Sequence, residues 1–238
     1  SIASTTVGYE RENAWWAPYL RDDDEDGFVT ALLDGQPDAH AYFARMKRQN
    51  KLGPAVIGEP APLVEFDNAT LASRLASDEL IFVDTRHNSK VHAGTVARSL
   101  NVPGVGKAAS YGAWVYDPER ESRPLVLLAD NETTAREYRD HLVRVGIDTV
   151  IGYTPSLDGL PLVVPAVIAQ EDLGDAARAL LLDVRNRTEF ADGHIPGAAQ
   201  LSGGRVLWHL DELPTDGRII AYCQSGVRVS VAASALRR

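Results

Sequence analysis

The feature that most constrains the fold is a short pattern that occurs twice in the chain of 238 residues. An apolar run that ends in Asp-x-Arg stands at residues 82–86 (Phe-Val-Asp-Thr-Arg) and again at residues 181–185 (Leu-Leu-Asp-Val-Arg), 99 positions later (183 − 84). The same offset places Gly94 on Gly193. Repetition at one spacing is the signature of a duplicated structural unit. The sequence therefore predicts two copies of one unit.

From Leu63 onward, short apolar runs alternate with helix-favouring segments such as residues 131–145. Four apolar runs have the length of buried strands, and they cover residues 80–83, 125–128, 179–182 and 219–222. This alternation is typical of an α/β fold with a mostly parallel sheet flanked by helices. We expect two such units, one over residues 61–160 and the other over residues 161–238.

Residues 1–60 have a different character. They contain the acidic run 22–26, and their pattern predicts short helices around residues 25–33 and 38–50. A cluster of Gly and Pro at residues 58–62 is typical of a linker. We expect this helical and extended leader to be a connector that packs on another domain.

The overlay of the two copies can be carried beyond the first strands. With an offset of 93 (223 − 130), Asp130 of the first copy falls on Cys223 of the second. The first copy then continues through a turn and a strand at residues 146–151, whereas the second reaches Arg238 before that point. We therefore expect the second copy to lack its last strand and to leave a sheet edge uncovered.

Composition argues against several classes of function. With 33 acidic residues against 24 Lys and Arg, the net charge of −9 disfavours a nucleic-acid or anionic-membrane partner. No apolar run approaches the roughly 20 residues of a membrane span, and no secretory signal stands near the start. A single Cys excludes an internal disulfide and a multi-thiolate zinc site. We expect a cytoplasmic protein without a metal site or other cofactor.

The strongest candidate for a catalytic site is the segment of residues 223–228, Cys-Gln-Ser-Gly-Val-Arg. Cys223 follows a predicted strand and precedes a helix-favouring stretch, so unpaired N–H groups and the helix dipole should favour an anion there. The same field lowers a thiol pKa from its usual value of about 8.5. The residues expected to bind substrate through this loop are Gln224, Ser225, Gly226 and Val227, and Arg228 adds a cationic donor fork.

Two other interpretations of Cys223 and its loop remain open. A lone cysteine is often an inert, small apolar residue. A cysteine phosphatase or arsenate reductase would need Cys-x5-Arg, with arginine at position 229, which is Val229; Arg228 makes the spacing Cys-x4-Arg. The smaller ring suits one sulfur atom better than a tetrahedral phosphate.

Three further residues support the predicted site. Asp183 and Arg185 stand at the end of a strand, where they either brace the cysteine loop or line its pocket. Glu189 either faces the site or lies on a solvated helix face. His194 precedes Ile-Pro-Gly and is predicted to be a hydrogen-bonding turn residue rather than a base.

The loop 223–228, with residues 182–185 (Leu-Asp-Val-Arg) and 193–198 (Gly-His-Ile-Pro-Gly-Ala), resembles the active-site loop and upstream signature of rhodanese sulfurtransferases. The resemblance implies that the Cys223 thiolate takes sulfur from thiosulfate or a small persulfide and passes it to a thiol, sulfite or cyanide. Arg228 would then orient the anionic donor. The alternative is a non-catalytic module that carries or senses persulfide.

The first copy is similar in layout, but it keeps only Asp84-Thr85-Arg86, Gly94 and Val102-Pro103-Gly104 of that signature. Its loop, which begins at Asp130, has neither a nucleophile nor an arginine. The resemblance therefore implies that the first copy is inactive and serves as a scaffold.

The leader carries a second resemblance. Residues 7–11 (Val-Gly-Tyr-Glu-Arg) and 42–48 (Tyr-Phe-Ala-Arg-Met-Lys-Arg) resemble the connector of proteins that fuse a metallo-β-lactamase-like persulfide dioxygenase domain to tandem rhodanese modules. This implies an upstream partner domain with a non-haem iron, which only that domain would hold. The His-x-His-x-Asp-His metal motif of such a domain does not occur in the sequence.

Overall fold

The computed structural model describes residues 4–34, 36, 38–169, 171–173 and 179–238. Contacts between Cα atoms divide the chain into two compact units, residues 1–38 and residues 39–238. Within the described ranges, no helix combines the length and the apolar character that a bilayer crossing requires.

The first unit consists of three short helices, α1 (Val7–Asn13), α2 (Ala17–Arg21) and α3 (Glu25–Leu33). The acidic run begins α3: the side chain of Asp24 accepts a hydrogen bond from the Gly27 N–H, and Glu25 and Asp26 lie in the first turn. Acidic groups stabilise a helix start because its N–H groups are unpaired there. The predicted helix at 25–33 is confirmed.

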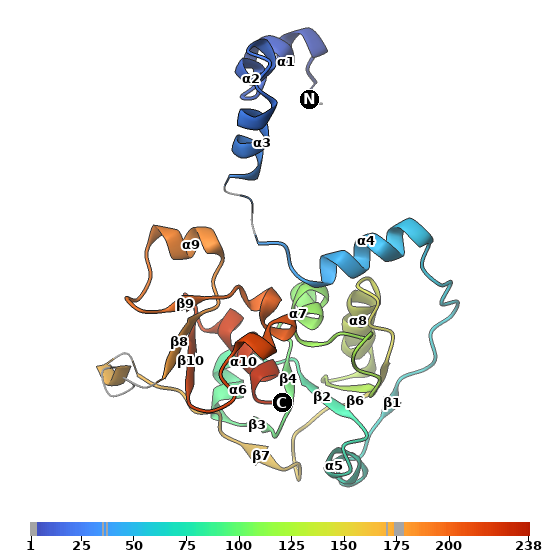
Figure 1. Cartoon of the computed structure of the whole chain (residues 1–238). Helices are drawn as coiled ribbons and strands as arrows, with labels where there is room; N and C mark the ends of the chain where they lie inside the picture. Colours follow the sequence, from blue (N-terminus) through green and yellow to red (C-terminus); the bar gives the residue numbers. More distant parts are fainter. Residues whose placement is uncertain (1–3, 35, 37, 170, 174–178) are drawn as a thin grey trace. The chain divides into compact units, whose positions relative to one another are not determined.

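The second unit is a mixed α/β structure with mostly parallel strands, which confirms the predicted α/β class (Figure 1); the division into two repeated units stays a prediction. Its helices are α4 (Tyr42–Leu52), α5 (Asn68–Ala76), α6 (Asn88–Ala93), α7 (Ala108–Val115), α8 (Glu132–Val143), α9 (Arg187–Asp192) and α10 (Val227–Leu236), with 3-10 turns η1 (Val105–Lys107), η3 (Gly203–Trp208) and η4 (Leu210–Glu212). Its strands are β1 (Val64–Glu65), β2 (Ile81–Asp84), β3 (Thr95–Val96), β4 (Leu100–Asn101), β5 (Leu125–Leu128), β6 (Val150–Thr154), β7 (Leu162–Val163), β8 (Leu180–Asp183), β9 (Ala199–Gln200) and β10 (Ile219–Tyr222).

The strands form two parallel sheets and one small ribbon. The larger sheet has the order β1-β6-β5-β2-β4, and the smaller has the order β10-β8-β9. Strands β3 and β7 form the antiparallel ribbon. On its other edge, β10 has no partner strand within the described residues.

The predicted strands at 125–128 and 219–222 match β5 and β10, whereas β2 and β8 lie one residue later than predicted. The reason is that each of these two strands includes its terminal aspartate. Asp84 pairs with Asn101 of β4, and Asp183 pairs with Tyr222 of β10.

Helix α4 begins at Tyr42, so the predicted start of this helix at residue 38 is wrong. The Ala41 N–H donates to the Gly204 carbonyl, which holds the preceding backbone outside the helix. Helix α4 also belongs to the α/β unit rather than to residues 1–38, because the buried Arg45 donates a hydrogen bond of 2.6 Å to the Val145 carbonyl. The segment predicted as a single leader, residues 1–60, therefore divides after residue 38.

Strand pairing changes the overlay of the two repeated segments. Ile81 of β2 lies opposite Leu125 of β5, and Leu180 of β8 lies opposite Ile219 of β10. The first strands of the two pairs are 99 positions apart (180 − 81), but the second strands are 94 apart (219 − 125). The offset of 93 inferred from sequence alone is therefore one residue too small.

With the corrected offset, Ala129 rather than Asp130 occupies the register position of Cys223. The sequence overlay placed Asp130 at that position, so the overlay and the strand register differ by one residue. The link between strand and helix has three residues in the first segment (129–131) and four in the second (223–226). The extra residue enlarges the loop that contains the thiol.

Helix α10 joins the two sheets. Its Val231 and Ala235 are buried in the same hydrophobic cluster as the residues of β2 and β5. Two of its serines bond to Asn101 of β4: the Ser230 hydroxyl donates to Oδ1 at 2.7 Å, and Ser234 Oγ accepts from the Asn101 N–H at 3.0 Å. The helix that follows Cys223 is therefore anchored in the larger sheet's core.

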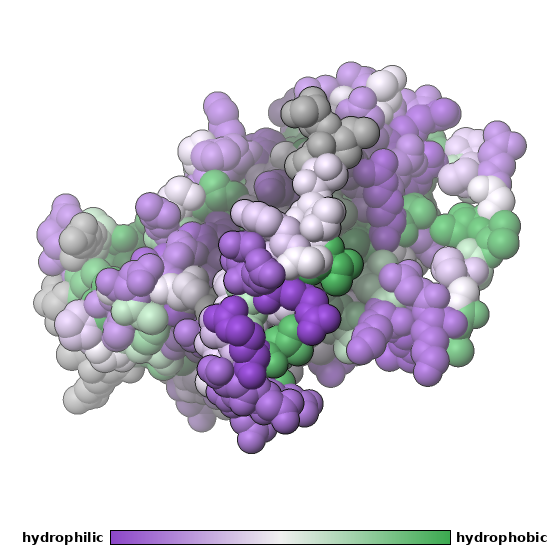
Figure 2. Space-filling model, turned by 90° about the horizontal axis from the view of Figure 1, so that it is seen from above, coloured by the Kyte–Doolittle hydropathy of each residue, from purple (hydrophilic) through white to green (hydrophobic). Residues whose placement is uncertain are grey.

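The surface is mixed in hydropathy. On the face seen in Figure 2, hydrophilic side chains predominate and hydrophobic ones form separate patches. Such scattered patches are normal for a folded protein.

Candidate functional site

The cysteine loop occupies residues 223–226, between β10 and α10. Gly226 is the residue before the first turn of α10 and has a φ of 84°, which is in the left-handed region. A Cβ atom at this position would lie 2.6 Å from Nδ2 of Asn88. Glycine is therefore required here both by its backbone conformation and by the neighbouring side chain.

Cys223 lies half-buried at the carboxyl end of β10. The Val229 N–H, in the first turn of α10, donates to its Sγ at 3.4 Å. This contact is what the sequence predicts for a thiol at the start of a helix. Gln224 and Ser225 are exposed, and Val227 is half-buried.

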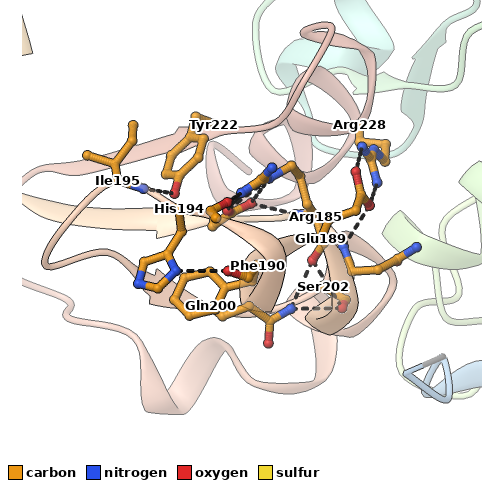
Figure 3. Close-up of polar contacts among 12 residues, drawn as sticks. Arg185, Glu189, Phe190, His194, Ile195, Gln200, Ser202, Tyr222 and Arg228 are labelled. Carbon is orange, nitrogen blue, oxygen red and sulfur yellow. Dashed lines mark hydrogen bonds and ion pairs between the residues drawn. The ribbon is translucent and has the colours of Figure 1, made fainter. Parts of the chain in front are cut away.

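Arg228 is paired with Glu189 (Figure 3). Its guanidinium donates two hydrogen bonds to the Glu189 carboxylate, at 2.5 and 2.8 Å. Glu189 also accepts from the Asn186 N–H at 3.2 Å and so closes a capping box at the start of α9. Glu189 thus links α9 to α10 through Arg228, and it is not among the residues that line the cavity beside the thiol.

Asp183 and Arg185 form a brace at the end of β8. Asp183 is 0% exposed, and Arg185 bonds to it through Nε and through Nη2 at 2.6 Å. Burial raises the pKa of Asp183, but the hydrogen bonds from Arg185 outweigh it and the net pKa lies below its usual value. Nη2 also donates to the Gly193 carbonyl at 2.7 Å, which fixes the turn beside the loop.

The same brace recurs in the larger sheet. There Arg86 bonds to the buried Asp84 and donates to the Gly94 carbonyl at 2.7 Å. One difference separates the two: Asp84 accepts a further hydrogen bond from the Thr95 hydroxyl, whereas Asp183 is hydrogen-bonded to Tyr222.

Sequence reasoning missed Tyr222. Its hydroxyl accepts a hydrogen bond from the Ile195 N–H at 3.2 Å, and the Arg185 guanidinium lies 5.8 Å from the centre of its ring. Figure 3 shows the phenol reaching the turn at Ile195. Its place directly before the cysteine was the available signal, but nothing local indicated which residues it contacts.

A cavity of about 470 Å³ opens beside the thiol. It is lined by Arg185, Gly193, His194, Ile195, Pro196, Tyr222, Cys223 and Gln224. Arg228 is not part of this lining, so the cationic groups at the cavity are Arg185 and, when protonated, His194. The His194 ring stacks on Phe190, and its Nδ1 lies 2.8 Å from the Phe190 carbonyl, as expected of a turn residue.

No cluster of three or more His, Cys, Asp or Glu side chains in the described part of the chain could hold a metal ion. His87 accepts a hydrogen bond from the Ser89 N–H at the start of α6.

The Glu189–Arg228 pair predicts a pH effect on stability. Hydrogen bonds from Arg228 lower the pKa of Glu189 from 4.5 to about 2. A lowered folded-state pKa stabilises the protein above pH 4.5, and this contribution is lost as the pH falls toward 2. We expect Glu189→Gln to lower the free energy of unfolding by about 1 kcal/mol at pH 7, because the pair is partly exposed and screened. Urea unfolding at pH 7 and at pH 3 measures the difference.

Glu121→Gln is the matched control. Arg123 and, to a smaller extent, Arg238 lower the pKa of Glu121 to about 2 in the same way, and Arg238 follows the end of α10 that is opposite to the cysteine loop. Both variants should lose stability at pH 7 and approach the wild type at pH 3, but only Glu189→Gln should change the reactivity of Cys223. A stability gap for Glu189→Gln that widens on acidification contradicts the prediction.

Comparison with known proteins finds relatives of the part of the chain that contains the cysteine loop. Residues 167–238 match the family model described as a rhodanese-like domain. A sulfurtransferase of Allochromatium vinosum is 39% identical over 56 residues, 24% of this chain and 52% of that protein. The uncharacterised protein YqhL of Bacillus subtilis is 39% identical over 61 residues, 26% of this chain and 48% of that protein. The chain spans about half the length of these curated relatives.

Two solved structures are similar at a coarser level. A metallo-β-lactamase from Staphylococcus aureus aligns with a TM-score of 0.47 and 20% identity, over 65% of this chain and 41% of that one. A thiosulfate sulfurtransferase from Pseudomonas aeruginosa aligns with a TM-score of 0.33 and 17% identity, over 82% and 43%. Likenesses at these scores carry no argument about function. Residues 167–238, which include Cys223 and its loop, thus match the model of a rhodanese-like domain, and the chain is similar to a protein named sulfurtransferase.

Proposed function

We propose that the chain is a sulfurtransferase in which Cys223 carries a sulfur atom from a small donor to a nucleophilic acceptor. One observation supports this most directly. Within the rhodanese-like domain, the Cys223 thiol is half-buried at a strand end, receives the Val229 N–H at 3.4 Å and borders a cavity of about 470 Å³.

The proposed transfer has two balanced steps. The Cys223 thiolate attacks the outer sulfur of thiosulfate, a bond forms between the two sulfur atoms, and sulfite leaves with the electron pair of the broken sulfur–sulfur bond. An acceptor such as cyanide, sulfite or a thiolate then attacks the outer sulfur and releases the Cys223 thiolate. A small persulfide donor reacts in the same way, with a thiolate as leaving group. Splitting one transfer into two attacks is the advantage of a covalent intermediate.

The chain's residues hold the reacting groups in this scheme. The Val229 N–H stabilises negative charge on sulfur, as a preorganised donor does. Arg185 is the cation that borders the cavity and faces an anionic donor, although its guanidinium is also bonded to Asp183. Arg228 forms an ion pair with Glu189, and its guanidinium can contact the anionic donor only when this ion pair opens.

The test is a mass measurement followed by a turnover assay. We expect that the chain incubated with thiosulfate and desalted gains the mass of one sulfur atom, and that added cyanide removes it with formation of thiocyanate. A gain without turnover would replace the proposal by a module that only carries persulfide. The absence of both would overturn it, and Cys223-dependent cleavage of an aryl phosphate would favour a phosphatase instead.

A further inference from the structure

The cysteine loop touches a side chain that belongs to the other sheet. Asn88 is the first residue of α6, which follows β2, and it is only 8% exposed. Its Nδ2 lies so close to Gly226 that a Cβ at position 226 would be 2.6 Å away. A residue 138 positions earlier in the chain (226 − 88) thus borders the left-handed turn that leads into α10.

The carbonyl oxygen of this amide is unusual. Asn88 Oδ1 is buried and has no hydrogen-bond partner in the described part of the protein. Buried polar atoms are nearly always paired, because leaving one unpaired is costly, so an exception calls for an explanation. If position 88 served only to fill space in the core, an apolar residue of similar size would fill it without the free-energy cost of an unpaired oxygen.

Tyr111 of α7 interacts electrostatically with the thiol. Burial raises the pKa of Tyr111, while the charge of Arg228 lowers it and that of Cys223 raises it. The charged and titratable groups around Cys223 therefore include Arg228, which holds Glu189, and Tyr111, together with Arg185, His194 and Tyr222 of the cavity lining. The amide of Asn88, beside Gly226 of the cysteine loop, carries no charge.

We propose that Asn88 is a positioning residue of the Cys223 loop. Its amide sets the left-handed turn at Gly226, and this turn directs the N–H groups at the start of α10 toward the sulfur. The larger sheet, whose loop after β5 contains no cysteine, thus contributes Asn88 to the cysteine loop that follows β10 of the smaller sheet. The effect on turnover rests on the proposed function, whereas the effect on thiol reactivity does not.

The experiment compares Asn88→Asp and Asn88→Ala with the wild type. The reactive form of a thiol is the thiolate, so the pH profile of Cys223 alkylation by iodoacetamide reports the surroundings of the sulfur. Asn88→Asp keeps the shape and adds a negative charge, and we expect it to slow alkylation at pH 7 about three- to tenfold and to move the profile to higher pH. Asn88→Ala removes the amide without adding charge and should fall between the wild type and Asn88→Asp.

Ser89→Asp is the matched control, because it adds the same charge at an exposed neighbour on the same helix. It should stay within about twofold of the wild type. Thermal melts confirm folding of each variant, and if Asn88→Asp does not fold, the comparison of Asn88→Ala with the wild type decides. Equal alkylation profiles for the wild type and the folded Asn88 variants overturn the proposal.

The two proposals fail separately. If the wild type gains no sulfur from thiosulfate but alkylation still follows the order wild type, Asn88→Ala, Asn88→Asp, the positioning role stands and the sulfurtransferase proposal falls. If the wild type turns over and the Asn88 variants match it in both assays, the positioning role falls and the sulfurtransferase proposal stands.

Discussion

Replacing Cys223 by serine is expected to abolish the sulfur mass gain and to lower turnover of thiosulfate with cyanide more than about a thousandfold. A serine hydroxyl stays protonated at neutral pH and cannot form a persulfide. The exchange of one small side chain at a half-buried position leaves packing nearly unchanged, so the melting temperature should shift little. Intact-mass spectrometry, the thiocyanate assay and a thermal melt on the same preparations measure the three quantities.

Ser89→Ala provides a control outside the loop. Ser89 is exposed at the start of α6 and does not line the cavity, so its truncation should retain the turnover and the mass gain. A Cys223→Ser variant that still gains sulfur from thiosulfate would show that the sulfur resides on another group, and the proposed role of Cys223 would then be wrong.

The second large effect concerns the buried brace. We expect Asp183→Asn to lower the free energy of unfolding by about 3 kcal/mol, because it removes the charge that compensates Arg185 while Arg185 stays in place. It also weakens the hydrogen bonds that fix the turn at Gly193 and hold Tyr222 beside Cys223. Urea unfolding and the Cys223 alkylation rate should therefore both change.

Asp84→Asn is the natural comparison, since Asp84 and Arg86 make the same brace in the larger sheet. Its stability cost should be within about 1 kcal/mol of that of Asp183→Asn, because both aspartates are 0% exposed. The alkylation rate should fall more in Asp183→Asn, whose brace contacts the strand that ends at the thiol. An Asp183→Asn protein as stable as the wild type would show that this buried pair makes no net contribution.

Local features of the fold and of the site could be predicted from sequence. The apolar runs became strands within one residue of the prediction, because a buried strand and its turn are encoded in a few consecutive side chains. The Asp183–Arg185 brace could be proposed for the same reason, since its two partners lie two positions apart on one strand end. The cysteine at the start of a helix is equally local.

Partners that are distant in sequence needed the tertiary structure. Arg228 meets Glu189, Asn88 meets Gly226 and Tyr222 meets Ile195, and no spacing rule connects any of these pairs. The alignment of the two loops is a similar case. Ala129 could be aligned with Cys223 only once the pairing of the strands had fixed the register.

The sequence by itself therefore determined the α/β class, the strand segments and the position of the candidate cysteine between a strand and a helix, because each depends on periodicity or chemistry within a short window. Only the tertiary structure decided that Arg228 is held by a carboxylate, that Tyr222 supports the turn and that the larger sheet supplies Asn88 to the loop. The physical reason is that such contacts depend on how the two sheets pack. Packing brings together side chains that are far apart in the chain, and no local sequence pattern indicates which of them will be in contact.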